Sequence, residues 1–333
     1  MTGQHKIIRL GLAACYLLAA GQLNAASPAL CPPSRALFDE MRKRVLAPTG
    51  AHVVVVAHRA CHSAAPENST EAIEACWKMG VEVVENDVRR TKDGHLVIIH
   101  DGEVDRVTDG YGYVGDMTLA ELKLLFLREA GGGPSAMVTN IRISTLEEHL
   151  LAAKDKVMVN MELKPADGNS WQSLYEQAIQ MARRLGVLDQ VLLKVPDVRS
   201  HGQRGGKHLL ETMEFARDVN LMPIIWQSER PAASRLDQLE PYTPVGYEVP
   251  VLDVSYLTSV ATDPRIRSRP IMAIALKPYW SGGLDDRAAL REPGAAWGGL
   301  LRAGATMIMT DRPEYLLSYL SKAGRRAEYR CLR

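Results

Sequence analysis

The sequence lacks an excess of charge of either sign. Its 333 residues contain 40 lysines and arginines and 39 aspartates and glutamates, which gives a formal net charge of +1. Nucleic-acid-binding proteins usually carry a basic stripe, so this balance argues against such a partner. The sequence also lacks internal repeats and low-complexity tracts, and its hydrophobic content of 46% is ordinary for a soluble globular protein. A chain of this length can form one large α/β barrel or two ordinary domains.

The N-terminal region lacks an apolar run long enough to cross a bilayer. Residues 10–20 are apolar, but a spanning helix needs about 20 such residues. The basic residues Lys6 and Arg9 precede this run, and small residues follow it at 23–26. This order is typical of a secretory signal peptide, which we predict over residues 1–26. We therefore expect an exported protein, periplasmic or secreted, whose mature chain has no transmembrane segment.

Two other interpretations of this leader are weaker. A buried first helix would also be apolar. Residues 12–15 resemble a bacterial lipobox ending at Cys15, but Arg9 would interrupt the short apolar stretch before the cut, and the run continues to Ala20. Removal of the leader would take away two basic residues and no acidic one, leaving 38 basic and 39 acidic residues.

The sequence has few cysteines, five in all. Without the leader four remain, at positions 31, 61, 76 and 331, and four cysteines allow three pairings in an oxidising compartment. We favour a bridge between Cys31 and Cys331, because the termini of a domain often lie close together. Cys61 and Cys76 would then be left for each other. A disulfide needs α-carbons within about 7 Å, so the loop after Cys61 would have to fold back along the helix that carries Cys76.

Apolar runs that resemble strands alternate with amphipathic stretches that resemble helices. The strand-like runs are residues 53–57, 81–88, 96–99, 157–162, 191–193, 222–226, 271–276 and 306–309. The helix-like stretches include residues 70–79, 146–153, 171–185, 208–219 and 295–303. This alternation indicates βα units and a parallel sheet, and about eight strands over this length favour an α/β fold of the (β/α)₈ TIM-barrel class. Residues 245–254 are ambiguous and are a candidate for the sixth strand.

Residues 101–144 break the alternation. They are rich in glycine and show no clear periodicity apart from a short helical stretch at 119–126. We interpret them as an insertion over the C-terminal face of the barrel. The mature chain, residues 27–333, is expected to be a single (β/α)₈ domain.

Two histidines stand where apolar strands are predicted to end. His58 follows four valines and an alanine, and His100 follows residues 96–99. The carboxyl ends of the strands form the catalytic face of such a barrel. A single histidine there would more often be structural, but two such endings favour a pair of acid–base groups. Arg59, beside His58, is either a phosphate ligand or a surface charge.

Three carboxylates are predicted to face the barrel interior. Glu85 and Asp87 are two residues apart on one strand, so their side chains share a face, and Glu162 and Lys164 share a face of another strand. Acids that meet in a barrel interior repel each other unless a cation neutralises them, and hard divalent ions such as Ca²⁺ and Mg²⁺ take oxygen ligands. We predict that Glu85, Asp87 and Glu162 bind one such ion and that Lys164 contacts phosphate. A solvated edge strand and a simple Glu162–Lys164 ion pair are the alternatives.

Five short motifs follow one another along the chain. They are His58-Arg59-Ala60, Pro66-Glu67-Asn68-Ser69, Glu85-Asn86-Asp87-Val88, Lys92-Asp93-Gly94 and His100-Asp101. In this order they resemble the glycerophosphodiester phosphodiesterase family, whose pattern is His-Arg-Gly, Pro-Glu-Asn-Thr, Glu-x-Asp-Val, Lys-Asp-Gly and a strand ending in His-Asp. The resemblance covers roughly residues 53–320. It is dense in the first half and thin between about 195 and 300.

The resemblance implies a (β/α)₈ barrel, one divalent metal ion and two histidines acting as general acid and base. Carried over by position, His58 and His100 are the histidines. The metal ligands are Glu85, Asp87 and Glu162, and the phosphate ligands are Arg59 and Lys164. This sequence departs from the pattern at Ala60, where the family has glycine, and at Cys61-His62, a reactive-looking pair beside the site. Ser69 replaces threonine, but both residues can start a helix. Asp311, before the helix that Pro313 begins, is a candidate N-cap.

The predicted function is metal-dependent hydrolysis of small-molecule glycerophosphodiesters to glycerol 3-phosphate and an alcohol. Either water or a neighbouring substrate hydroxyl would be the attacking group. The alternatives on the same barrel are a lysophospholipase D and an enzyme similar to phosphatidylinositol-specific phospholipase C. Such long-chain substrates need an exposed apolar rim, and the insertion supplies little beyond residues 124–127. A non-catalytic exported phosphodiester-binding protein would not need both histidines and all three carboxylates.

Overall fold

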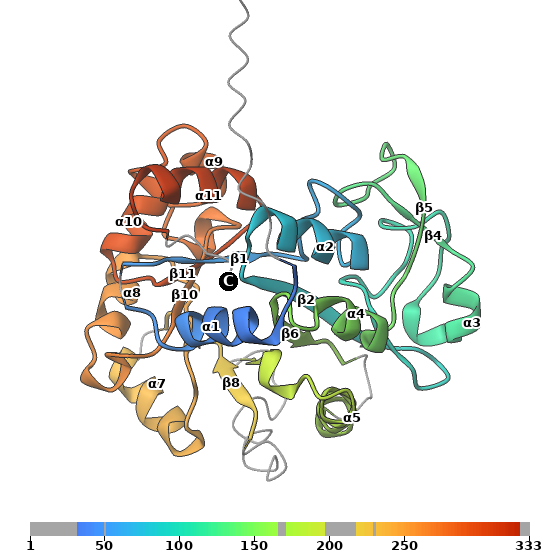
Figure 1. The fold of residues 1–333 in the computed structure, drawn as a ribbon, viewed down its shortest axis with the longest axis horizontal. Helices are drawn as coiled ribbons and strands as arrows, with labels where there is room; N and C mark the ends of the chain where they lie inside the picture. The colour runs from blue at the N-terminus through green and yellow to red at the C-terminus, as the bar shows by residue number, and fades with distance from the viewer. Residues whose placement is uncertain (1–31, 50, 166–170, 197–217, 229–230, 327–333) are drawn as a thin grey trace, which may run out of the picture. The chain divides into compact units, whose positions relative to one another are not determined.

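Eight parallel strands form a nearly closed barrel with helices on its outer side (Figure 1). The computed structural model describes residues 32–49, 51–165, 171–196, 218–228 and 231–326. Around the barrel the strands are β8 (Asn220–Pro223), β7 (Val191–Val195), β6 (Met158–Leu163), β2 (Val83–Arg90), β1 (Val54–Ala57), β11 (Met307–Thr310), β10 (Ile271–Ile274) and β9 (Tyr247–Glu248). The barrel closes between β8 and β9, where the amide of Ile225 donates to the carbonyl of Glu248 at 2.8 Å. The predicted (β/α)₈ barrel is confirmed.

Helices follow the strands in the order expected of βα units. They are α2 (Thr70–Met79), α4 (Leu146–Ala153), α5 (Trp171–Arg184), α7 (Ala232–Leu239), α8 (Val254–Ala261), α9 (Asp286–Ala289), α10 (Ala296–Arg302) and α11 (Pro313–Lys322). The helices predicted at 70–79 and 146–153 are confirmed with those bounds, and α5 and α10 lie within one residue of their predicted limits. The helix predicted at 208–219 falls mostly on residues outside the described ranges.

Local signals explain these helix bounds. The hydroxyl of Ser69 accepts a hydrogen bond from the amide of Ala72 at 3.1 Å and so caps α2. Gly80 ends the helix with φ of +84°, a conformation that glycine adopts without steric cost. At the start of α4, Thr145 and Glu148 form a reciprocal capping box.

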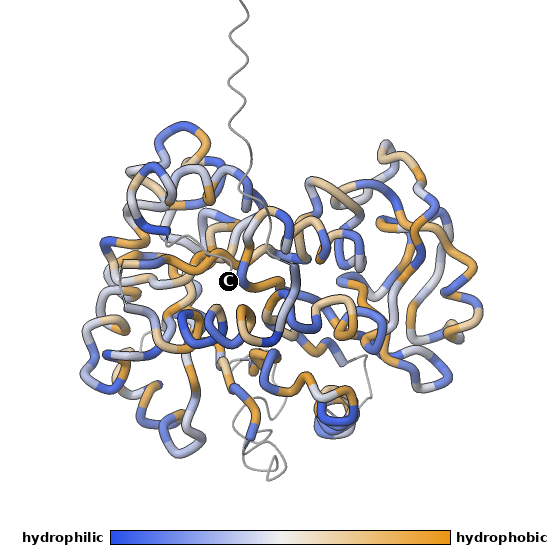
Figure 2. Tube along the Cα trace, in the orientation of Figure 1, coloured by the Kyte–Doolittle hydropathy of each residue, from blue (hydrophilic) through white to orange (hydrophobic). Residues whose placement is uncertain are grey.

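The barrel wall separates two apolar layers, because alternate residues of a strand point to opposite sides. One layer packs between the sheet and the outer helices and includes Val55, Val159 and Leu193. Figure 2 shows α5 with both hydrophilic and hydrophobic residues, which fits a helix with one side against this layer. The inward layer contains many methionines. Its strand residues are Val54, Val56, Val83, Met158, Leu192, Met222, Met272, Ile274, Met307 and Met309, and Leu276 after β10 joins them.

Helix α1 (Arg35–Leu46) closes the N-terminal end of the barrel. Its residues Phe38, Met41 and Val45 are buried in the same cluster as the inward-facing strand residues. Several of those strand residues lie at the start of their strands, as Val54 and Met307 do. The helix therefore fills the end of the barrel opposite the carboxyl ends of the strands.

One strand was predicted at the right residues but in the wrong place, as a parallel strand of the barrel. The run at 96–99 forms β3 (Leu96–Ile98), which pairs antiparallel with β2 and lies outside the ring of parallel strands. Only residues 91–95 connect β2 to β3, whereas a parallel crossover needs a dozen or more residues. The ambiguous segment 245–254 supplies the missing barrel strand as β9.

The insertion forms a small subdomain with its own apolar cluster. It contains the short helix α3 (Leu119–Leu122) and a two-stranded sheet of β4 (Phe126–Arg128) and β5 (Val138–Arg142). The helix predicted at 119–126 therefore ends earlier, and Phe126 begins a strand that was not predicted. Its cluster contains Val97, Ile99, Val104, Val107, Val114, Leu122, Leu127 and Ile143.

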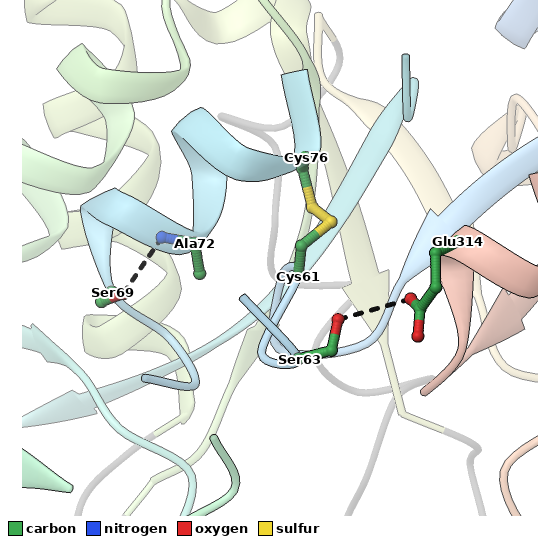
Figure 3. Close-up of a disulfide and its surroundings, with 6 residues drawn as sticks. All are labelled: Cys61, Ser63, Ser69, Ala72, Cys76 and Glu314. Carbon is green, nitrogen blue, oxygen red and sulfur yellow. Dashed lines mark hydrogen bonds between the residues drawn. A yellow bond between two sulfur atoms is a disulfide. The ribbon is translucent and has the colours of Figure 1, made fainter. Parts of the chain in front are cut away.

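A disulfide ties the loop after β1 to α2 (Figure 3). The α-carbons of Cys61 and Cys76 are 5.2 Å apart, and both side chains are buried. Turns between residues 58 and 64 bring the loop down beside the helix, as this pairing requires. Closing a loop of 15 residues contributes about 3 kcal/mol in the chain-entropy account. The other predicted bridge, Cys31–Cys331, lies outside the described residues.

None of the described helices combines the length and the apolar character that crossing a bilayer requires.

We expect Phe38→Ala to destabilise the protein by about 3–5 kcal/mol, because it leaves a cavity under the barrel. Lys43→Ala, on the exposed side of the same helix, should change the free energy of unfolding by less than about 0.5 kcal/mol. Urea denaturation of both variants measures the difference. Equal stabilities would contradict the assigned role of α1.

A variant in which Cys15, Cys31 and Cys331 are replaced by serine isolates the described disulfide. Thiol titration of this variant, unfolded without reductant, should detect no free thiol, and reduction should release both. Two thiols before reduction would show that Cys61 and Cys76 are unpaired.

Candidate active site

A cavity of about 490 Å³ opens at the carboxyl ends of the barrel strands. Its charged and polar lining consists of His58, Arg59, His62, Glu67, Asp87, His100, Arg106, Glu162, Lys164, Lys194, Glu248, Lys277 and Asp311. Its apolar lining includes Ile224, Trp226, Ile274, Leu276, Trp280 and Met309. Six of the seven predicted site residues line this cavity, and the seventh, Glu85, lies buried behind it.

Three carboxylates meet at the base of this cavity. Glu85 and Asp87 are on β2, and Glu162 is the direct neighbour of Asp87 on β6. One carboxylate oxygen from each residue lies within 4.8 Å of the others. Oxygen ligands of Ca²⁺ lie about 2.3–2.6 Å from the ion, so ligands on its opposite sides are about 5 Å apart. The spacing and the donor type therefore fit one hard divalent cation.

Two lysines also balance these acids. Lys164 Nζ is 3.0 Å from Asp87 Oδ1 and 3.1 Å from Glu162 Oε1. Lys194 Nζ, on β7, is 2.7 Å from Glu162 Oε2 and 3.4 Å from Glu85 Oε1. Lys164 thus lines the cavity and also forms the ion pair with Glu162 that was the alternative to a phosphate contact.

Burial and charge act against each other on these acids. Burial raises the pKa of Glu162, but Lys194 and Lys164 outweigh it and lower that pKa to about 2. Burial likewise opposes ionisation of Asp87, yet Lys164, His100 and Arg59 hold its pKa below the ordinary range. Burial and the charge of Asp87 raise the pKa of Glu85. The three acids are therefore not equivalent.

His58 is oriented by Asp311. Its Nδ1 is 2.8 Å from Asp311 Oδ1, and Nε2 of His62 is 3.2 Å from the same oxygen. Burial lowers the pKa of His58, but the hydrogen bond to Asp311 and the charges of Glu85 and Asp311 raise it above the ordinary value. The N-cap position of α11 is Arg312. The interpretation of Asp311 as an N-cap was therefore wrong, because its side chain binds the two histidines.

His100 is oriented by its neighbour in the chain. Its Nδ1 is 2.6 Å from Asp101 Oδ1. The hydrogen bond from His100, together with the interaction with Arg106, outweighs burial and holds the pKa of Asp101 below the ordinary range. His100 follows an antiparallel strand, but the amide of Ile99 donates to the carbonyl of Asp87 at 2.9 Å. This contact brings His100 to the carboxyl end of β2.

Glu67 connects the insertion to the arginine beside His58. Its carboxylate accepts hydrogen bonds from Arg106 at 2.7 and 2.9 Å and from Arg59 at 3.2 Å. Arg106 belongs to the insertion and also binds Asp101. Arg59 is therefore held with its guanidinium in the cavity lining by a partner from the Pro-Glu-Asn-Ser motif.

The next residue of that motif, Asn68, contacts Asp87, one of the three clustered carboxylates. Its side-chain amide donates to Asp87 Oδ2 at 2.9 Å. Asn68 has φ of +60°, in the left-handed region, which asparagine tolerates better than most residues. The motif thus fixes Asp87 as well as Arg59.

The loop after His58 explains the glycine of the family pattern. Ala60 has φ of +62° and Arg59 has φ of +52°, a region that costs strain for a residue with a β-carbon. The turn directs the amide of Arg59 to Glu85 Oε2 at 3.1 Å. The disulfide at Cys61 follows directly and holds this strained turn in place.

Sequence reasoning missed several cavity residues. Lys194 lies inside an apolar run, and an isolated charge within a buried strand was the available signal. Glu248 falls in the segment that was ambiguous. The partnership of His58 with Asp311 joins residues 253 apart in sequence, so no local pattern indicated it.

One wall of the cavity is apolar. The rings of Trp226 and Trp280 are 6.2 Å apart in an edge-to-face arrangement. They come from segments after β8 and β10, within the part of the chain where the family resemblance is thin. From the sequence, an apolar rim was sought in the insertion. The apolar surface beside the cavity comes instead from the segments after β8 and β10.

Comparisons with known proteins agree with this geometry. The model of the glycerophosphoryl diester phosphodiesterase family matches residues 58–200, and a domain of unknown function matches residues 221–320. A glycerophosphodiester phosphodiesterase of Caldanaerobacter subterraneus is 43% identical over 113 residues, which are 33% of this chain and 45% of that protein. The uncharacterized protein YqiK of Bacillus subtilis is 33% identical over 266 residues, 78% of this chain and 95% of that protein.

Solved structures show the same fold. A glycerophosphoryl diester phosphodiesterase of Parabacteroides distasonis has a TM-score of 0.68 at 21% identity, covering 88% of this chain and 94% of that one. An Oleispira antarctica phosphodiesterase, solved with the product sn-glycerol-3-phosphate, has a TM-score of 0.59 at 20% identity, covering 80% and 96%. The motif match, the long relative and the shared barrel lead to one assignment: the chain belongs to the glycerophosphoryl diester phosphodiesterase family.

Proposed function

We propose that this protein hydrolyses glycerophosphodiesters to glycerol 3-phosphate and an alcohol with the help of one divalent ion. The observation that carries the proposal is the convergence of two oriented histidines and three clustered carboxylates on one cavity. The matched relatives named as glycerophosphodiester phosphodiesterases, and the neighbour solved with sn-glycerol-3-phosphate, support the substrate class.

The two histidines are proposed to transfer protons. Each has its Nδ1 on an aspartate, which leaves Nε2 for the substrate. One would take the proton of the attacking hydroxyl and the other would protonate the leaving alcohol. The attacking group is water or a neighbouring hydroxyl of the substrate, and either histidine can hold either role.

Two cations of the cavity are proposed to bind the phosphodiester. Arg59 and Lys164 both line the cavity and carry charges that suit phosphate oxygens. Glu85, Asp87 and Glu162 would hold Ca²⁺ or Mg²⁺, and a bound ion would neutralise the phosphodiester charge. Glu67 keeps the guanidinium of Arg59 in place for this contact.

A lysophospholipase D activity is the second candidate function. The apolar wall with Trp226 and Trp280 favours it, because an acyl chain needs such a surface beside the phosphodiester. The pairing of both histidines with aspartates favours turnover over simple capture of a phosphodiester.

We also propose that the protein is exported. The predicted leader over residues 1–26 supports this, and so does the disulfide of Cys61 and Cys76, since disulfides persist in oxidising compartments.

The purified protein should release glycerol 3-phosphate from glycerophosphocholine, measured with a coupled dehydrogenase assay. Chelation should remove the activity, and Ca²⁺ or Mg²⁺ should restore it. Parallel assays with lysophosphatidylcholine test the second candidate function. Binding of glycerophosphocholine without product release would overturn the enzymatic proposal.

Replacement of His58 or His100 by alanine should lower turnover by about 10²–10⁴, because each removes a proton-transfer group. His95→Ala is the matched control, since His95 is exposed in the turn before β3. It should leave turnover within about twofold of the wild type. Circular dichroism establishes that the variants fold. Substantial activity in either cavity variant would exclude the two-histidine mechanism.

A further inference from the structure

Lys194 occupies an unusual position for a lysine. It lies on β7 within the apolar run Val191–Val195, and only 5% of its surface is exposed. Lysine is almost never fully buried unless it is paired. Here the ammonium is 2.7 Å from Glu162, 3.4 Å from Glu85 and 3.4 Å from Glu248. Two of these three partners are proposed metal ligands.

Glu248 pairs with Lys194 and is not one of the proposed metal ligands. It is buried on β9, and its Oε1 faces Lys194. It is not among the three residues whose oxygens cluster within 4.8 Å. Its other oxygen, Oε2, has no hydrogen-bond partner among the described residues. A buried carboxylate of this kind requires a nearby cation, and Lys194 is the lysine that meets it.

The charges at the base of the cavity add up to a net negative charge that one divalent ion would neutralise. The carboxylates are Glu85, Asp87, Glu162 and Glu248, and the ammonium groups that touch them are Lys164 and Lys194. With every group counted as ionised, four carboxylates and two ammonium groups carry a formal charge of −2. Arg59 Nε is also 3.7 Å from Asp87, but that guanidinium is shared with Glu67.

We propose that Lys194 is an internal counter-ion, fixed by Glu248, that holds Glu85 and Glu162 in position in the absence of a metal and limits the site to one divalent ion. This inference rests on the metal site of the proposed function. Without Lys194, three clustered acids and Glu248 would repel one another until an ion arrived. With it, that repulsion is offset before the ion binds, but the ion must share two of its ligands with an ammonium group, and this competition has the larger effect on the Kd. Lys194 is a positioning residue in this account and takes no part in proton transfer.

Lys194→Met tests the proposal, because methionine keeps most of the side-chain volume and removes the charge. We expect the Kd for Ca²⁺ and for Mg²⁺, measured by calorimetry without substrate, to fall at least tenfold. We also expect the metal to raise the melting temperature of this variant more than that of the wild type. An unchanged or higher Kd would overturn the proposal.

Two further variants separate this role from a general effect of charge. Lys277→Met removes an exposed lysine that lines the same cavity, and it should change the Kd less than about threefold. The double variant Lys194→Met with Glu248→Gln restores the formal charge of −2, and its Kd should return to within about threefold of the wild type. An effect of Lys277→Met as large as that of Lys194→Met, or a double variant that stays as tight as the single one, would contradict the pairing.

Glu248→Gln alone keeps the proposal testable if Lys194→Met fails to fold. In this variant Lys194 pairs with Glu85 and Glu162 alone and competes more strongly with the ion, so the Kd should rise. A fall in the Kd would overturn the inference. Failure of the proposed function looks different. A wild-type protein that binds neither ion and whose turnover resists chelation would refute the metal site itself, whereas normal binding with no response to Lys194→Met would refute only the role of Lys194.

Discussion

The structure depends on burying negative charge at the carboxyl end of a parallel barrel. Glu85 and Asp87 are buried and Glu162 lines the cavity beside them, and buried carboxylates are stable only beside cations. Lys164 directly after β6, Lys194 on β7 and the loop arginine Arg59 supply part of that charge. The strained turn after β1 and Asn68 are arranged around the same carboxylates. Much of the structure at the carboxyl ends of the barrel strands therefore serves to stabilise these acids.

At the amino ends of the barrel strands the requirement is instead to bury apolar side chains. Inward-facing side chains there are apolar, and α1 packs against them. This division follows from strand alternation together with position along the strand, since the same inward face of β6 carries Met158 at its start and Glu162 near its end. Packing in the apolar half fixes the positions of the strands relative to one another. Because of this, side chains from different strands lie within hydrogen-bonding distance in the polar half.

The parts of the site that the sequence predicted are those carried by local pattern. His58 ends a buried strand, and the spacing of Glu85 and Asp87 fixes their common face, so both were available from the order of residues. The direction of β3 was predicted wrongly because an apolar run does not state its pairing partner. The roles of Asp311, Lys194 and Glu248 were not predicted, because they come from contacts between strands that are distant in the sequence. Helix α1 was not among the predicted helices, so its closure of the barrel was not predicted either.

The ion-pair chain from Asp101 through Arg106 and Glu67 to Arg59 joins the insertion to the barrel. It gives the insertion a role that its surface position would not suggest. Arg59 and Arg106 share one carboxylate, so a shift of the inserted subdomain changes the balance of charge on the arginine beside His58. A change in this insertion that moves or removes Arg106 therefore reaches the cavity lining, because, of the two arginines, it leaves Glu67 with Arg59 alone.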